Sequence, residues 1–244
     1  MMEKFTSLSH PLWFSIVSLW FSVSFTSCDS GDIYPKKYER ETGVVVKASF
    51  TFEELETFPS SYQMLFGAFG KGKVEPIVSK TLVKPKQGQE VTIMLSNLPE
   101  DATSLKLCLT SLGKQPVYTF YKTDIPENTG DSIVIPVQEI HLMQFDRIQQ
   151  QIFTPSCIAC HGNPGAAGLN LSEGASYNGL VGVPATKSIE PKTRVAASDV
   201  DNSFLINILE HGGLLKTDHT SIPSKYNDDI VLLKEWILSD AKKN

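Results

Sequence analysis

The hydrophobic period of this chain changes once, near Glu139, and that change limits the folds open to it. From residue 43 onward short apolar runs alternate with polar residues, most clearly between Val91 and Leu95. A period of two places one face of a β-strand on a core and the other in water. After Glu139 apolar residues recur at helical spacing instead. We therefore expect two domains of different class, over residues 43–138 and 139–244.

The first of these domains consists of short alternating segments separated by turn residues. Glycine, proline and asparagine cluster between the segments, for example at residues 70–72 and 126–128. Short strands at this spacing are typical of an all-β sandwich, immunoglobulin-like or similar. Residues 43–140 contain no histidine and no acidic cluster with metal-ligand spacing, and we expect lone Cys108 to be structural. The domain is either a spacer or partner-docking module, or a fold without activity of its own.

An apolar run without charges, from Leu12 to Phe25, precedes both domains. Its length suits the hydrophobic region of a signal peptide better than a transmembrane helix. The following Thr-Ser-Cys28 resembles a lipobox, where bacterial lipoproteins are cut and acylated, although an aliphatic residue usually stands at the position of Phe25. We expect a lipoprotein signal peptide at residues 1–27, a tether at 28–42 and a membrane anchor on Cys28. The alternative is an ordinary secretory leader, with Cys28 as a free thiol of the mature protein. Both interpretations place the protein outside the cytoplasm, facing the periplasm or the cell surface.

The strongest chemical signal is the run Cys157-Ile158-Ala159-Cys160-His161, the attachment pattern of c-type haem. Two thiols three residues apart lie about one helical turn from each other, which suits two vinyl groups on one edge of a porphyrin. His161 then approaches the iron from the same side as its proximal ligand. The pattern predicts one covalent haem c, bound through Cys157 and Cys160.

Two other chemistries are compatible with the same residues. A Cys-x-x-Cys pair can be a thiol–disulfide site, but such a site normally begins a helix in a βαβ fold, which this sequence does not predict. A zinc site could combine Cys157, Cys160 and His161 with His211 or His219 as the fourth ligand. The histidine directly after the second cysteine and the predicted export favour haem, and zinc stays open.

Several helices are expected around the motif, enough to enclose a flat ring. Apolar residues at helical spacing predict one before it, between Leu142 and Phe153. A short helix is expected near residues 175–181, and another begins with Asp201 as its N-cap. The last runs over residues 227–238, where we expect Trp236 to be a core residue.

Residues 152–239 resemble the small single-haem domains of the planctomycete-type cytochrome c family, which are common at the ends of exported lipoproteins. The resemblance is carried by residues 152–162, 167–171, 180–184, 201–205 and 235–237. It implies a class I cytochrome c fold, mostly α, with a distal methionine in a Met-Pro pair before the last helix. Here that pair is Ile222-Pro223, and no methionine follows Met143. A His/Met iron site within this domain is therefore not expected.

Two histidines lie on the approach to that loop. His219 stands three residues before Ile222, and we predict it as the distal iron ligand because imidazole is a common ligand of iron. His211 is a weaker alternative, since its position at the end of a helix also suits contact with free carbonyls. Lys216 is a remote further option, and an open sixth position is the other alternative.

These observations lead to a functional hypothesis. We expect an exported, lipid-anchored electron carrier that exchanges single electrons with redox partner proteins and is not itself an enzyme. The alternatives are a haem-based sensor or docking subunit with an open iron position, and a zinc-stabilised interaction protein without haem. The net charge of −5 and the absence of a long basic run give no support to nucleic-acid binding.

Overall fold

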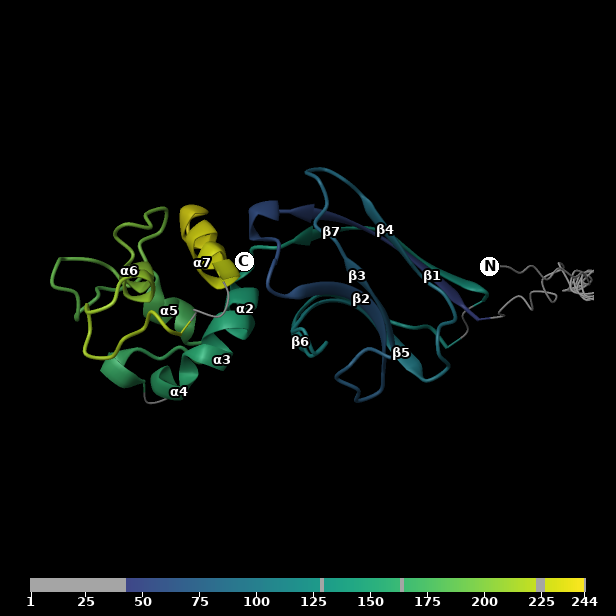
Figure 1. Ribbon diagram of the computed structural model, residues 1–244, viewed down its shortest axis with the longest axis horizontal. Coiled ribbons are helices and arrows are strands. Elements are labelled where there is room, and N and C mark those ends of the chain that lie inside the picture. Colours follow the sequence, from purple (N-terminus) through teal and green to yellow (C-terminus); the bar gives the residue numbers. More distant parts are fainter. Residues whose placement is uncertain (1–42, 128–129, 163–164, 223–226, 244) are drawn as a thin grey trace, which may run out of the picture. The chain divides into compact units, whose positions relative to one another are not determined.

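The structure is a computed structural model that describes residues 43–127, 130–162, 165–222 and 227–243 (Figure 1). These described residues belong to one compact unit. The predicted signal peptide, the tether and Cys28 lie outside the described residues. Within the described residues, no helix combines the length and apolar character needed to cross a membrane.

Seven strands in the described part of the chain form two sheets. The strands are β1 (Val45–Glu53), β2 (Gln63–Gly70), β3 (Val78–Leu82), β4 (Val91–Leu95), β5 (Ala102–Thr110), β6 (Pro116–Asp124) and β7 (Ser132–His141). One sheet has the order β4-β1-β7 and the other β3-β2-β5-β6. β1 pairs antiparallel with β4 and parallel with β7, while all pairs of the second sheet are antiparallel. A short 3₁₀ helix, η1 (Leu55–Thr57), follows β1.

Alternate residues of both sheets form one hydrophobic core. Phe50 of β1 and Phe66 of β2 are fully buried in it, with ring centres 5.4 Å apart. In β4 the alternation works as the sequence predicts, because Ile93 is buried while its neighbour Met94 is exposed. Cys108 is buried in a separate small cluster with Leu65 and Phe69, and burial raises the pKa of its thiol.

The rest of the chain contains short helices. They are α2 (Phe145–Ile148), η2 (Gln149–Phe153), α3 (Thr154–Ser156), α4 (Ile158–His161), η3 (Ala166–Gly168), α5 (Ser176–Leu180), α6 (Phe204–Glu210) and α7 (Asn227–Leu238). α2, the π-helical η2 and α3 form one continuous helical run (Figure 1). A second core joins this run to α6 and α7, and Trp236 is buried in it as predicted, with its ring centre 5.3 Å from that of Phe145.

The predicted fold class, an immunoglobulin-like sandwich followed by a mostly α cytochrome c-like domain, is wrong. In the described part of the chain β-sheet predominates. The two sheets contain seven strands in all, and the helices are short and make up 24% of the structure. Helices do occur near each predicted place, but long irregular segments join them. Between α5 and α6 the backbone is held by isolated bridges, among them Val181 with Val195 and Thr193 with Ser203. Positive φ at Gly182 (71°) and prolines 184 and 191 prevent a helix there.

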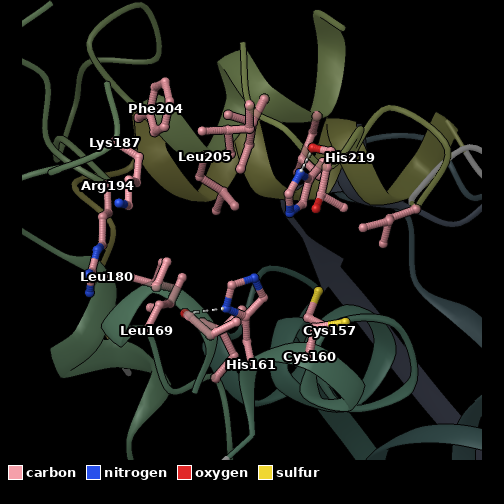
Figure 2. A pocket seen from close by; sticks show the side chains of 18 of the residues that line it. Cys157, Cys160, His161, Leu169, Leu180, Lys187, Arg194, Phe204, Leu205 and His219 are labelled. Atoms are coloured by element: carbon pink, nitrogen blue, oxygen red, sulfur yellow. Dashed lines mark hydrogen bonds between the residues drawn. The ribbon is translucent and has the colours of Figure 1, made fainter. Parts of the chain in front are cut away.

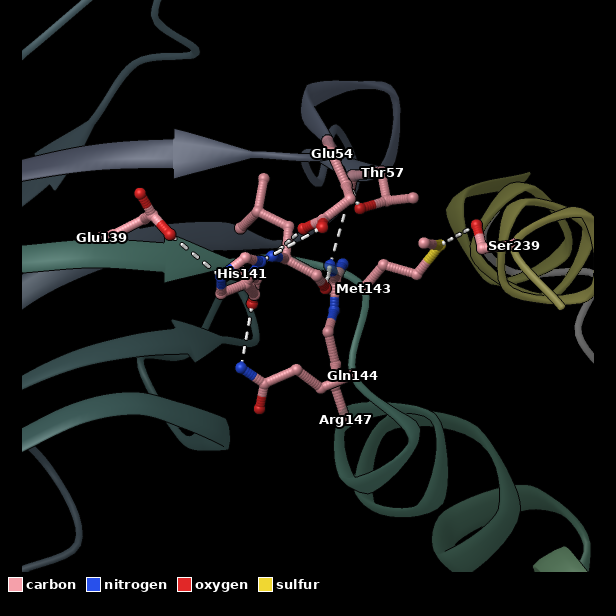
Figure 3. A network of polar contacts seen from close by, with 9 residues as sticks. Glu54, Thr57, Glu139, His141, Met143, Gln144, Arg147 and Ser239 are labelled. Carbon is pink, nitrogen blue, oxygen red and sulfur yellow. Dashed lines mark hydrogen bonds and ion pairs between the residues drawn. The ribbon is translucent and has the colours of Figure 1, made fainter. Parts of the chain in front are cut away.

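Hydrogen bonds around Arg147 connect α2 to the segment that follows β1 (Figure 3). The Arg147 side chain is fully buried, and its Nη1 donates to the carbonyl oxygens of Thr57 (3.1 Å) and Leu142 (2.7 Å). The two cores separate here, since Leu142 belongs to the first and Phe145 to the second. The domain boundary at residues 138–139 stays a prediction.

Candidate functional site

A cavity of about 500 Å³ lies beside the Cys157–His161 motif (Figure 2). Its walls come from the helices η2, α3, α4, α5 and α6, from the segments that follow α4 and α5, and from residues 215–222. Most of the lining is apolar, and includes Ile152, Phe153, Leu169, Leu171, Leu180, Leu205, Ile208 and Leu209. A cavity with such walls suits an apolar ligand better than a hydrated one.

The motif forms a helical turn that brings its reactive side chains to this cavity. The carbonyl oxygen of Cys157 accepts hydrogen bonds from the amides of Cys160 (3.2 Å) and His161 (2.9 Å). Residues three apart in a helical turn share a face. Both thiols accordingly lie at one end of the cavity, with the ring of His161 further along its floor (Figure 2).

The two thiols differ in their exposure to solvent. Cys157 is partly buried, and this burial, with smaller effects of Asp229 and Cys160, raises the pKa of its thiol to about 11. It is therefore a protonated thiol at neutral pH. Cysteines of thiol–disulfide sites have a lowered pKa instead. The environment of Cys157 thus disfavours a thiol–disulfide site. Cys160, in contrast to the partly buried Cys157, is exposed to solvent.

The ring of His161 is oriented by the loop that follows it. Its Nδ1 lies 3.1 Å from the carbonyl oxygen of Ala166, and because a carbonyl only accepts, Nδ1 must carry the proton. Nε2 then keeps its lone pair for a metal ion, the usual arrangement of a histidine ligand. The loop requires glycine at position 165, since a Cβ there would overlap the backbone carbonyl of Leu169.

The ring of His219 is oriented in the same way from the other side. Its Nδ1 donates to the carbonyl oxygen of Thr217 at 2.8 Å, which leaves Nε2 free. A turn fixes its backbone, because the amide of Ile222 donates to the carbonyl of His219 at 3.1 Å. The carboxylate of Asp218 accepts from the amide of Thr220 at 2.9 Å in the same loop. Both His219 and Ile222 line the cavity.

The two imidazoles face one another across the cavity (Figure 2). Their ring centres are 6.2 Å apart and their planes differ by 35°. A metal ion bound to one nitrogen of each ring, with bonds of about 2 Å, would hold the ring centres about 6 Å apart. His161 and His219 therefore have the spacing that two histidine ligands of one metal ion would need.

The other predicted ligands, His211 and Lys216, are both exposed. His211 is exposed at the end of α6, where its amide donates to the carbonyl of Asn207 (2.9 Å), and it does not line the cavity. Lys216 does line the cavity but is exposed. Among the described residues, no group of three or more Cys, His, Asp or Glu side chains is placed to hold a metal ion.

The residues present fit a haem. Two thiols lie at one end of an apolar cavity and two imidazoles with free Nε2 atoms face each other across it. A zinc ion needs no cavity of about 500 Å³ with apolar walls, whereas a flat, largely apolar ring does. The donor set and the walls therefore favour haem over zinc.

Searches against protein-family models, curated proteins and solved structures found no match to this chain. The resemblance to the planctomycete-type cytochrome c family consequently stays a prediction based on the residues that carry it.

The sequence did not reveal every residue that shapes the site. The carbonyl groups of Ala166 and Thr217 orient the two histidines, and backbone groups leave no signature in a single sequence. For Gly165 the sequence offered only a weak indication of a tight loop, namely the other glycines close to it. Arg194 and Lys187 also line the cavity, but their spacing in the sequence did not predict a place in the site.

Proposed function

We propose that this protein is an electron carrier with one haem c, attached to Cys157 and Cys160 and ligated by His161 and His219. The observation that carries the proposal is the facing pair of imidazoles at 6.2 Å, each with its Nδ1 occupied by a backbone carbonyl. When bound, haem iron supplies a one-electron redox couple.

The protein's own residues hold the rings of His161 and His219 in place for a bound haem. Hydrogen bonds to Ala166 and Thr217 fix the ring orientations of His161 and His219 independently of any ligand. If His161 and His219 both held the iron, small molecules would find no free site on it, which would favour electron transfer over sensing or catalysis. Two histidines also imply a lower reduction potential than a histidine–methionine pair.

The surroundings of the cavity suit electron exchange with a partner protein. Its apolar walls would exclude water from most of a bound ring, while the exposed Cys160 places the thiol end at the surface. We place the protein outside the cytoplasm, because haem attachment to Cys-x-x-Cys-His takes place there in bacteria. A lipid anchor on Cys28 and a spacer or docking role for the two sheets complete the proposal.

Production in a host with haem-attachment machinery tests this function. Mass spectrometry of the mature protein should show the added mass of one haem, and a haem stain should survive denaturing electrophoresis. The C157A/C160A double variant should lose the stain, whereas Cys108→Ala should keep it, since Cys108 is buried among the strands. Free thiols at positions 157 and 160 without added mass would rule the proposal out.

A further inference from the structure

Two basic side chains lie at the end of the cavity away from the thiols. Arg194 and Lys187 both line the cavity, and Figure 2 shows them on the far side of His161 from Cys157 and Cys160. They come from the irregular segment between α5 and α6. Nothing in the proposed ligation of iron uses them.

The charges along the cavity wall are all of one sign. Its charged lining residues are Lys187, Arg194 and Lys216, and no Asp or Glu among the described residues lines it. This differs from the chain as a whole, which has 27 acidic against 22 basic residues. An apolar cavity with cations and no anions is suited to a ligand that is mostly apolar but bears negative groups.

Arg194 is held in place before any ligand binds. Its Nη1 donates to the carbonyl oxygen of Gly179 at 2.8 Å and its Nη2 to that of Gly168 at 3.3 Å. Its own amide donates to the carbonyl of Val183 at 2.7 Å. A guanidinium has five N–H groups, so three remain for a carboxylate in a geometry that its planar fork matches.

We propose that Arg194, assisted by Lys187, binds the carboxylate groups of the ligand in this cavity. For haem c these are the two propionates, which the porphyrin carries on the edge away from its vinyl groups. The inference rests on the proposed function and extends it by naming the residues that orient the ring. The thiols fix one edge of the ring, and Arg194 and Lys187 fix the opposite edge.

The test compares two ligands that differ only in their charged groups. The C157A/C160A variant, purified without haem, is titrated with ferric haem and separately with ferric haem dimethyl ester, in which both carboxylates are blocked. We expect the free acid to bind about tenfold or more tightly than the ester, as a charge-assisted hydrogen bond to a carboxylate implies. Adding Arg194→Gln and Lys187→Gln should abolish most of this preference while leaving the affinity for the ester unchanged.

The ester separates ligand recognition from a structural role. If Arg194 only supported the loops at Gly168 and Gly179, its replacement would weaken acid and ester equally, and the inference would be wrong. The matched control is Lys80→Gln, an exposed lysine on β3, which should keep the full preference. Equal affinities for acid and ester before substitution would also overturn the inference but leave the electron-carrier proposal standing. Failure to bind either ligand would overturn the inference, whereas the electron-carrier proposal is judged separately by the added mass of one haem on the mature protein.

Discussion

The imidazole rings of His161 and His219 face each other with their centres 6.2 Å apart. Each ring donates from Nδ1 to a backbone carbonyl, that of Ala166 for one and that of Thr217 for the other. The two histidines come from different segments of the chain, one from α4 and one from the loop before α7. Their matched hydrogen bonding therefore makes both Nε2 atoms available across one cavity.

Removal of the His219 ring should open the sixth position of the iron. In the haem-loaded protein, His219→Ala is expected to convert a low-spin optical spectrum into a high-spin one, because a strong-field ligand is lost. The reduced variant should then bind carbon monoxide rapidly, whereas the unsubstituted protein should bind it slowly. Optical spectroscopy with and without carbon monoxide measures both effects.

His211→Ala is the matched control for that experiment. His211 is exposed and lies outside the cavity, so its replacement should leave the spectrum unchanged. A spectrum that is unaltered in His219→Ala would exclude His219 as a ligand. Rapid carbon monoxide binding by the unsubstituted protein would favour the haem-based sensor instead.

Gly165 should tolerate no side chain. A Cβ at this position would overlap the carbonyl group of Leu169, a backbone group that cannot turn away as a flexible side chain can. We expect Gly165→Ala to destabilise the protein by about 2 kcal/mol and to displace the Ala166 carbonyl that orients His161. Urea unfolding measures the loss of stability. In the control Gly113→Ala the nearest atom, Oγ of Ser111, would be 3.9 Å away, and equal stability of the two variants would contradict the prediction.

The sequence predicted local features well and non-local ones poorly. The bounds of α7 were predicted at residues 227–238 because its apolar residues repeat with helical spacing along one face. The bridge between Val181 and Val195 joins two stretches of sequence that show no periodic pattern of apolar residues. The irregular segment between them was therefore not predicted. This is why the prediction of a mostly α domain failed although helices lie near the predicted places. Asp201 was wrongly predicted as an N-cap, because α6 begins at Phe204 with Ser203 at its N-cap.

The residues of the candidate site also differ in how well the sequence predicted them. Cys157, Cys160 and His161 lie within five consecutive residues, and their order and spacing alone predicted their chemistry. His219 was predicted as the distal ligand from its place three residues before Ile222. Its orientation toward His161 could not be predicted, because the turn at residues 219–222 contains no glycine or proline. Arg194 reaches the cavity through contacts with Gly168 and Gly179, which only the folded chain brings together.

A buried carboxylate makes the stability of the protein depend on pH. Asp229 of α7 accepts a hydrogen bond from Nε2 of Gln151 at 2.6 Å, and burial raises its pKa from 3.8 to about 6. Between these two values the folded protein binds a proton that the unfolded chain has released. The unfolding free energy therefore decreases as the pH rises through this range.

The Asp229→Asn variant isolates this effect. We expect the unfolding free energy of the unsubstituted protein, measured relative to Asp229→Asn, to fall by about 1–3 kcal/mol between pH 4 and pH 7. Urea denaturation at several pH values measures the difference. Asp131→Asn, at an exposed position, serves as the control and should show no such trend. A difference that stays constant with pH would show that Asp229 titrates normally.

Replacement of Arg147 should be among the most damaging substitutions in the chain. Burial lowers the pKa of its guanidinium to about 10, so it stays charged at neutral pH and depends on its hydrogen bonds to Thr57, Leu142 and Gln151. In Arg147→Ala these buried acceptors lose their donor and a cavity forms beside the ring of Phe120. We expect a loss of about 3–5 kcal/mol in urea unfolding.

Lys122→Ala provides the comparison for Arg147→Ala. Lys122 forms an ion pair with Asp124 at 3.7 Å, but both side chains are largely exposed, and such a pair contributes at most about 1 kcal/mol. If the two variants unfolded at similar urea concentrations, the Arg147 contacts would contribute no more than a surface pair does. A large loss confined to Arg147→Ala would instead establish that the junction between β1 and α2 depends on this one buried side chain.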